Sequence, residues 1–150
     1  MERLKFICAM LLLAAAAFGQ QRSIEGMKAE AEKAQGGQQA RLYAELAEQL
    51  VDVANQQFTN GSVTQAQATV QDVLACATKA HDASISSHNR LKETEIAFRK
   101  TKRHLDALKR TLAADDRPPL EDVVKKLEKF QQDLLNEMFA PPGKKKESKS

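Results

Sequence analysis

The sequence predicts an all-α fold in which antiparallel helical hairpins share one long central, coiled-coil-like helix. The composition favours helices, because Ala, Leu, Glu, Lys and Gln dominate and the 150 residues include only six Gly and four Pro. A heptad pattern of apolar and small residues runs through 64–113 without a Gly or a Pro. Two flanking segments, 39–59 and 119–139, each place their apolar residues on one helical face.

Residues 1–19 are expected to be a signal peptide that exports the protein. Two cationic residues precede an apolar run from Phe6 to Phe18, and Ala17-Phe18-Gly19 supplies the small residues of a cleavage site. The run is shorter than the roughly 20 apolar residues that are needed to span a bilayer, which favours cleavage. The alternative is that the segment is retained as a membrane anchor. Cleavage would place the chain in the bacterial periplasm or outside the cell, with 20–140 as a single helical domain.

Two helices are predicted after the signal, at residues 23–35 and 39–59. Ser23 can cap the first helix, and Gly36-Gly37 ends it. Apolar residues three or four positions apart define the buried face of the second helix: Leu42, Leu46, Leu50, Val53, Ala54 and Phe58. Asn60-Gly61 ends this helix, because Gly61 can adopt the left-handed conformation that closes a helix.

The junction after residue 50 carries a short motif. Ala54, Phe58, Gly61 and Ala66 form A-x-x-x-F-x-x-G-x-x-x-x-A, which resembles the core of one tetratricopeptide-type helix–turn–helix unit. The resemblance covers residues 50–74 and implies two closely packed antiparallel helices. No second unit follows, so a peptide-binding repeat array is not expected. The order of signal peptide, hairpin and long helix also resembles that of small exported bacterial helical proteins, and this likeness implies no activity.

The long helix is predicted over residues 64–113 and would be about 75 Å long. Two heptad positions form its repeat, the first occupied by Val70, Ala77, Ser84, Leu91, Phe98, Leu105 and Leu112, and the second by Val73, Ala80, Ser87, Thr94, Thr101 and Leu108. Its middle, residues 81–89, contains mediocre helix formers, and a kink with Asp82 capping a new helix is the alternative to a continuous helix.

The flanking helices would leave part of the long helix uncovered. Helix 39–59, folded back on the long helix, would cover it up to about residue 84. Helix 119–138, folded back from the other end, would cover it down to about residue 94. Residues 85–93 would then lack a partner, and a homodimer could cover them. The candidate contacts of this homodimer, in or directly beside the stretch, are Ser84, Ser87 and Leu91.

The segment Asp115-Asp116-Arg117-Pro118-Pro119 is expected to break the long helix, since each Pro disfavours helix in the residue before it. The last helix follows at 119–139, with a wide apolar face formed by Leu120, Val123, Val124, Leu127, Phe130, Leu134, Leu135 and Met138. Residues 141–150 form a Lys-rich tail that lacks apolar side chains after its prolines and is expected to be disordered.

The formal net charge of +3 belongs to the ends of the chain. Without residues 1–19 and the tail from Lys144, 17 basic and 18 acidic residues remain, a net charge of −1. Nucleic acid is therefore an unfavourable partner. A basic face on the second half of the long helix, which includes Arg99, Lys102 and Arg103, is expected to be balanced by acidic residues of the last helix. The alternative is an anionic partner, reached with help from the tail residues Lys144, Lys145 and Lys146.

No residue set predicts catalysis, a cofactor or a metal site. Removal of the signal would leave Cys76 as the single cysteine, so no internal disulfide can form, and burial as a small apolar residue is expected. His81, His88 and Glu95 are spaced seven residues apart, about 10 Å along a helix, which is too far for one helix to chelate a metal. Solvated edge positions are expected for all three.

Two classes of function remain compatible with the sequence. The first is an exported, non-enzymatic scaffold, adaptor or chaperone-like module that presents helical faces to a protein partner, with homodimerisation as an option. The second is a peripheral binder of anionic envelope surfaces, such as lipid headgroups or cell-wall polymer, through the basic helix face and the Lys tail. Salt should weaken the second interaction steeply and the first one little.

Overall fold

The computed structural model describes residues 24–141. Residues 24–33 form a helix, and it is followed by α2 (Gly36–Thr59), α3 (Val63–Ser87), α4 (Leu91–Thr111), the short 3-10 helix η1 (Ala114–Asp116) and α5 (Pro118–Phe139). This part of the chain contains no strand, and the all-α prediction is confirmed. The expected signal peptide at 1–19 and the tail residues Lys144, Lys145 and Lys146 lie outside the described residues.

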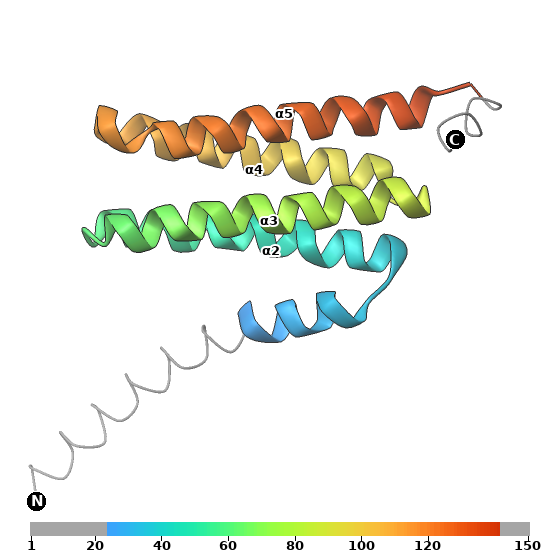
Figure 1. Ribbon diagram of the computed structural model, residues 1–150, viewed down its shortest axis with the longest axis horizontal. Helices are drawn as coiled ribbons and strands as arrows, with labels where there is room; N and C mark the ends of the chain where they lie inside the picture. Colours follow the sequence, from blue (N-terminus) through green and yellow to red (C-terminus); the bar gives the residue numbers. More distant parts are fainter. Residues whose placement is uncertain (1–23, 142–150) are drawn as a thin grey trace, which may run out of the picture.

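The four long helices form a bundle (Figure 1). Helices α2 and α4 run in one direction, and α3 and α5 run in the other. Each of α2 and α5 packs against both α3 and α4, whereas α3 and α4 face each other across the bundle and make few contacts. The connection from α3 to α4 therefore crosses the end of the bundle diagonally.

The prediction of one long helix over 64–113 is wrong. The chain ends α3 at Ser87, reverses direction through residues 88–90 and begins α4 at Leu91. The alternative of a kink capped by Asp82 is also wrong, because Asp82 lies within α3. The stretch that was expected to lack a partner is instead the turn itself, whose residues 86–90 are exposed, and the two hairpins pack on each other within one chain.

The turn between α2 and α3 has the hydrogen bonds of a helix C-cap closed by glycine. The N–H of Ser62 donates to the carbonyl of Gln57 at 2.8 Å, and the N–H of Gly61 donates to the carbonyl of Phe58 at 3.1 Å. Gly61 has φ +79°, the left-handed conformation that the sequence predicted for it.

The turn between α3 and α4 repeats this pattern without a glycine. The N–H of Asn89 donates to the carbonyl of Ser84, and the N–H of His88 donates to the carbonyl of Ile85, both at 3.2 Å. His88 occupies the left-handed position, with φ 50° and ψ 42°. Arg90, which precedes α4, is left-handed as well, with φ 53°. The turn has the standard capping hydrogen bonds of a helix end, although it lacks the glycine that usually occupies the left-handed position.

The heptad positions are buried even though the helix is interrupted. Nearly all of them lie in the core, where the largest fully buried side chains include Phe98, Leu105, Leu46, Leu120, Leu127 and Leu134. The apolar face predicted for the last helix is also confirmed, with five of its residues buried on α5: Leu120, Val123, Val124, Leu127 and Leu134. Seven-residue spacing thus specifies which side chains enter the core on both sides of the turn.

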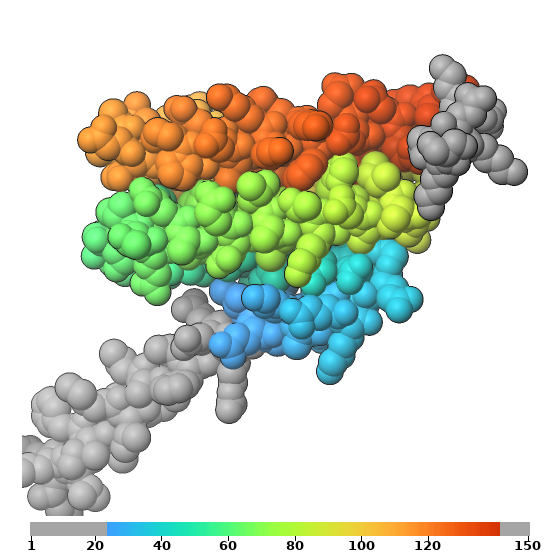
Figure 2. Space-filling view, in the orientation of Figure 1, coloured from blue at the N-terminus to red at the C-terminus, as the bar shows by residue number. Residues whose placement is uncertain are grey.

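The helix at 24–33 packs against the outside of the α2–α3 hairpin, and Figure 2 shows it beneath α3. The side chain of Gln39 donates from Nε2 to the carbonyl of Ala31 at 3.1 Å, which links this helix to the start of α2. Helix α2 begins at Gly36, three residues before the predicted start, so the two glycines lie in its first turn.

Candidate functional site on α4

Helix α4 differs from the other three long helices in its charge. It carries seven Lys and Arg residues and three Asp and Glu residues, a net charge of +4. The sequences of α2, α3 and α5 give net charges of −2, −1 and −2. Helix α4 is therefore the one long helix of the described bundle with a net positive charge.

Salt bridges account for part of this charge. Four of the seven cations have an ion-pair partner, with N–O distances between 2.5 and 3.4 Å: Arg99 with Glu95, Lys100 with Glu48, Lys102 with Glu128 and Lys109 with Asp106. One partner belongs to α2 and one to α5, so the acidic neighbours of α4 neutralise its flanks. The expected balance by the last helix is confirmed for Glu128 alone, since Asp133 instead lies 3.2 Å from His81.

The remaining three cations, Lys92, Arg103 and Arg110, form what we call the cationic row. All three are exposed, and no ion pair to them occurs within residues 24–141. Their spacings of 11 and 7 residues place them on one side of the helix, along about 27 Å of its axis. Ile96 lies in the same row, four residues after Lys92 and seven before Arg103, and its exposed fraction is 49%. This side of α4 therefore presents the positive charge of the cationic row, which no ion pair neutralises, together with one large apolar side chain.

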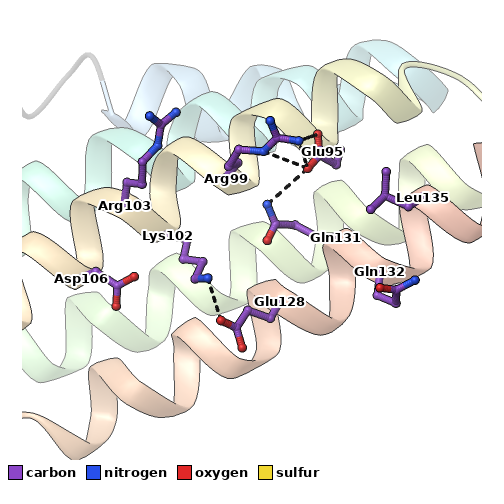
Figure 3. Close-up of a pocket in the computed structure, with 9 residues that line it drawn as sticks. All are labelled: Glu95, Arg99, Lys102, Arg103, Asp106, Glu128, Gln131, Gln132 and Leu135. Atoms are coloured by element: carbon purple, nitrogen blue, oxygen red, sulfur yellow. Dashed lines mark hydrogen bonds and ion pairs between the residues drawn. The ribbon is translucent and has the colours of Figure 1, made fainter.

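A shallow groove of about 430 Å³ lies beside the row, between α4 and α5 (Figure 3). We call it the α4–α5 groove, and its lining residues are Glu95, Arg99, Lys102, Arg103, Asp106, Glu128, Gln131, Gln132 and Leu135. The groove is mixed in charge, because its three cations face three carboxylates. It therefore offers polar contacts and one apolar side chain, Leu135, rather than a concentrated field of one sign.

Glu95 anchors the groove. Its side chain is only 6% exposed, and both its oxygens accept hydrogen bonds from Nη2 of Arg99, at 2.7 and 2.9 Å. Gln131 of α5 also donates to Oε1 at 3.4 Å (Figure 3). A buried carboxylate requires such donors, because it has lost its hydration. Arg99 is thus paired with Glu95 within α4, and Gln131 links Glu95 to α5. Arg103 is the neighbouring cation that faces solvent without an ion pair in the described bundle.

The residues predicted to form a dimer surface do not lie together on the surface. Ser84 is fully buried, and its Oγ donates to the carbonyl of Asn89 at 2.7 Å, so it closes the α3–α4 turn. Leu91 is 8% exposed and belongs to the core. Ser87 is exposed, and its Oγ donates to the carbonyl of Ala83 at 2.6 Å. The exposed cations Arg99 and Arg103, in contrast, do share one face with the half-buried Lys102.

Two of the three histidines, His81 and His88, contact α5, which the sequence did not indicate. His81 is not a solvated edge residue, since its side chain is 14% exposed and stacks on Phe130 with ring centroids 4.5 Å apart. Its two nitrogens lie 2.8 Å from Asp82 and 3.2 Å from Asp133. The imidazole of His88 lies 3.0 Å from Glu137. Both histidines therefore help to pair α3 with its parallel neighbour.

Cys76 is buried beneath the helix at 24–33. It lies beside a cavity of about 210 Å³ that Lys28, Asp72 and Lys79 also line. Burial raises the pKa of the Cys76 thiol; the two lysines act in the opposite direction and Asp72 in the same direction. A thiol held neutral in this way is a poor nucleophile.

Across residues 24–141, no cluster of three or more His, Cys, Asp or Glu side chains is arranged to hold a metal ion. None of the described helices combines the length and hydropathy that crossing a membrane requires. Comparisons with protein-family models, with curated proteins and with solved structures find no match to this chain.

Proposed function

We propose that the protein is an exported, non-enzymatic interaction module that binds an anionic partner through the outer face of α4. The observation that carries this proposal is the cationic row, three exposed cations without an ion pair on the one helix with a net positive charge. Ion pairs on the protein surface contribute about 0–1 kcal/mol each, so cations that lack them keep their charge available to a partner at little cost. The Lys-rich tail would add to the same attraction.

The charge distribution favours binding in one orientation over non-specific attraction to the whole surface. The described residues are acidic overall outside α4, so a polyanion would be repelled by most of the bundle and attracted by one face. Such a molecule orients itself on its partner. The orientation would leave α3, which is diagonally opposite α4, facing away from the partner and available for other contacts.

Triple substitution of the cationic row tests the proposal. The variant K92Q/R103Q/R110Q should elute from immobilised dextran sulfate at a lower salt concentration than the parent, because three charge contacts are lost. The matched control is K28Q/K33Q/K126Q, which removes three exposed cations located on the 24–33 helix and on the α3 side of α5. Equal elution of the two variants would show that net charge, and not the α4 face, determines retention.

A second candidate is a scaffold or adaptor for a protein partner, favoured by a groove between α2 and α4. This groove has a volume of about 250 Å³, with a floor of small residues that includes Ala44, Thr94 and Ala97. Its rim carries two arginines and two glutamates, so its net charge is zero. A partner that docked there would bind with little dependence on salt. Binding that survives the triple substitution and high salt would support this candidate over the first.

A further inference from the structure

We infer that the anionic partner of the α4 face is the surface of a lipid bilayer, into which Ile96 and Phe139 insert. The inference rests on the proposed function and adds the chemical class of the partner. It depends on two exposed apolar side chains that a purely electrostatic site does not need.

The first apolar side chain is Ile96, between Lys92 and Arg103 on the cationic side of α4. Lys92 lies one turn before it and Lys100 one turn after it, and all three are exposed. A soluble polyanion would pair with the cations but would leave the isoleucine in water. A bilayer surface offers phosphates and, a few ångströms deeper, acyl chains, so it satisfies both kinds of side chain at once.

The second is Phe139, the last residue of α5, with an exposed fraction of 80%. It follows Leu135 by four residues and Gln132 by seven, so it continues the side of α5 that lines the α4–α5 groove. Figure 3 shows Gln132 and Leu135 across this groove from Arg99 and Arg103. Helix α5 ends at the end of the bundle where α4 begins (Figure 1). Phe139 is the last residue of α5 and Ile96 lies in the second turn of α4, so the two belong to the same end of the α4–α5 hairpin.

Ile96 and Phe139 are the two large apolar side chains that residues 24–141 expose. Both belong to the α4–α5 hairpin, and the acidic α2–α3 hairpin exposes none within the described residues. The side chains that could insert into a bilayer therefore belong to the same hairpin as the cations that would attract it. The bundle would lie with α4 along the membrane plane, the row on the headgroups and the two apolar side chains below them. Aromatic and aliphatic side chains beside Lys and Arg are characteristic of helices that bind at the interface without crossing it.

Tryptophan fluorescence tests the insertion directly, because the chain contains no Trp. The protein from Gln20 to Ser150 retains the whole described bundle and lacks the apolar run at 6–18, which would itself bind lipid. We expect I96W and F139W to shift their emission to shorter wavelength with vesicles of equal parts phosphatidylglycerol and phosphatidylcholine, and to be quenched by brominated lipid. F58W, at the opposite end of the bundle, should show neither change.

Vesicle sedimentation separates the contribution of the two apolar side chains from that of the cationic row. The variant I96S/F139S keeps every charge, and we expect it to bind the anionic vesicles about tenfold more weakly than the parent. K92Q/R103Q/R110Q should lose about 100-fold, at about fivefold per cation. Circular dichroism verifies that both variants are folded, since all five positions are exposed.

Three outcomes would overturn the inference. One is unchanged emission of I96W and F139W under conditions where the vesicles sediment the protein. Another is parent-like binding of I96S/F139S. The third is retention on dextran sulfate, lost in K92Q/R103Q/R110Q, without binding to anionic vesicles. Each of these leaves the proposed anionic site on α4 standing, whereas parent-like retention of the triple variant on dextran sulfate removes both.

Discussion

Gly61 and His88 occupy the same backbone position in two different turns. Each is the left-handed residue that ends a helix, with the same pair of hydrogen bonds back into the preceding turn. For a residue with a Cβ this conformation costs about 1–2 kcal/mol, whereas glycine adopts it freely. The α3–α4 turn is therefore strained at His88, and it persists because the packing of α4 against α2 and α5 requires the reversal.

Replacing His88 by glycine should stabilise the protein. H88G removes the left-handed strain and loses an exposed contact with Glu137 that contributes about 0–1 kcal/mol. We expect the free energy of unfolding, measured by urea denaturation, to rise by about 1 kcal/mol. G61A is the matched control and should lower it by about 1 kcal/mol, because it introduces the same strain. A decrease for H88G would mean that the imidazole contributes more than the strain costs.

At the scale of the element, the sequence predicted the buried faces better than the helix ends. Ser84 and Leu91 are seven residues apart and both are buried, as the heptad pattern predicts, yet the chain reverses between them. Periodicity reports which side chains leave water and is unaffected by a turn that preserves the spacing. The α2–α3 turn was predictable because Gly61 marks it, and the α3–α4 turn was not, because His88 stands where a glycine would.

The candidate site was predicted only in part, for a related reason. Arg99 and Arg103 were identified as members of a basic face. Which cations lack a partner depends on α2 as well as α5, and the sequence does not show that Glu48 meets Lys100. Ile96 and Phe139 could not be singled out either, since the exposure of an apolar residue follows from the packing of its neighbours.

Helix α4 also contains a polar group that the core does not satisfy. Thr101 is fully buried, and its Oγ1 has no hydrogen-bond partner within the described bundle. An unpaired buried hydroxyl costs about 1–3 kcal/mol, and valine has nearly the same shape. T101V should therefore raise the free energy of unfolding by about 1 kcal/mol, as measured by urea denaturation.

Thr69 of α3 provides the matched control for this substitution. It is also buried, but its Oγ1 donates to Oε1 of Gln57 at 2.6 Å and lies 3.1 Å from the carbonyl oxygen of Gln65. T69V should lower the free energy of unfolding, because it removes a satisfied hydrogen bond and leaves Oε1 of Gln57 without its donor. Stabilisation by both substitutions would show that hydroxyl burial is unfavourable at either site, regardless of hydrogen bonding.

For the whole molecule, the diagonal connection from α3 to α4 determines which cations of α4 are neutralised. It places α4 between α2 and α5, which both have a net charge of −2. These neighbours pair with the cations on the flanks of α4, through Glu48 and Glu128, and cannot reach its outward side. A simple order of adjacent helices would have placed α4 beside α3, which is less acidic. The topology thus neutralises the flanks of α4 and confines its unpaired cations to the outward side, on a bundle that is otherwise acidic.

The same topology makes the α3–α4 turn a hinge for domain swapping. The heptad positions remain in register across residues 88–90, so a continuous helix from Val63 to Thr111 would bury the same side chains. That helix would be about 73 Å long, and it would carry the α4–α5 hairpin away from the α2–α3 hairpin of its own chain. Each hairpin could then recover its core only by packing on a second copy.

Removing the reversal should therefore produce dimers. The variant H88A/N89A/R90A replaces the two left-handed residues and the residue between them with the strongest helix former. We expect light scattering to show a dimer fraction well above that of the parent, with an unchanged helical content by circular dichroism. H88G, which favours the turn, should shift the protein the other way. A triple-alanine variant with the mass of one chain would mean that the packing of α4 against α2 and α5 specifies the reversal without help from these three residues.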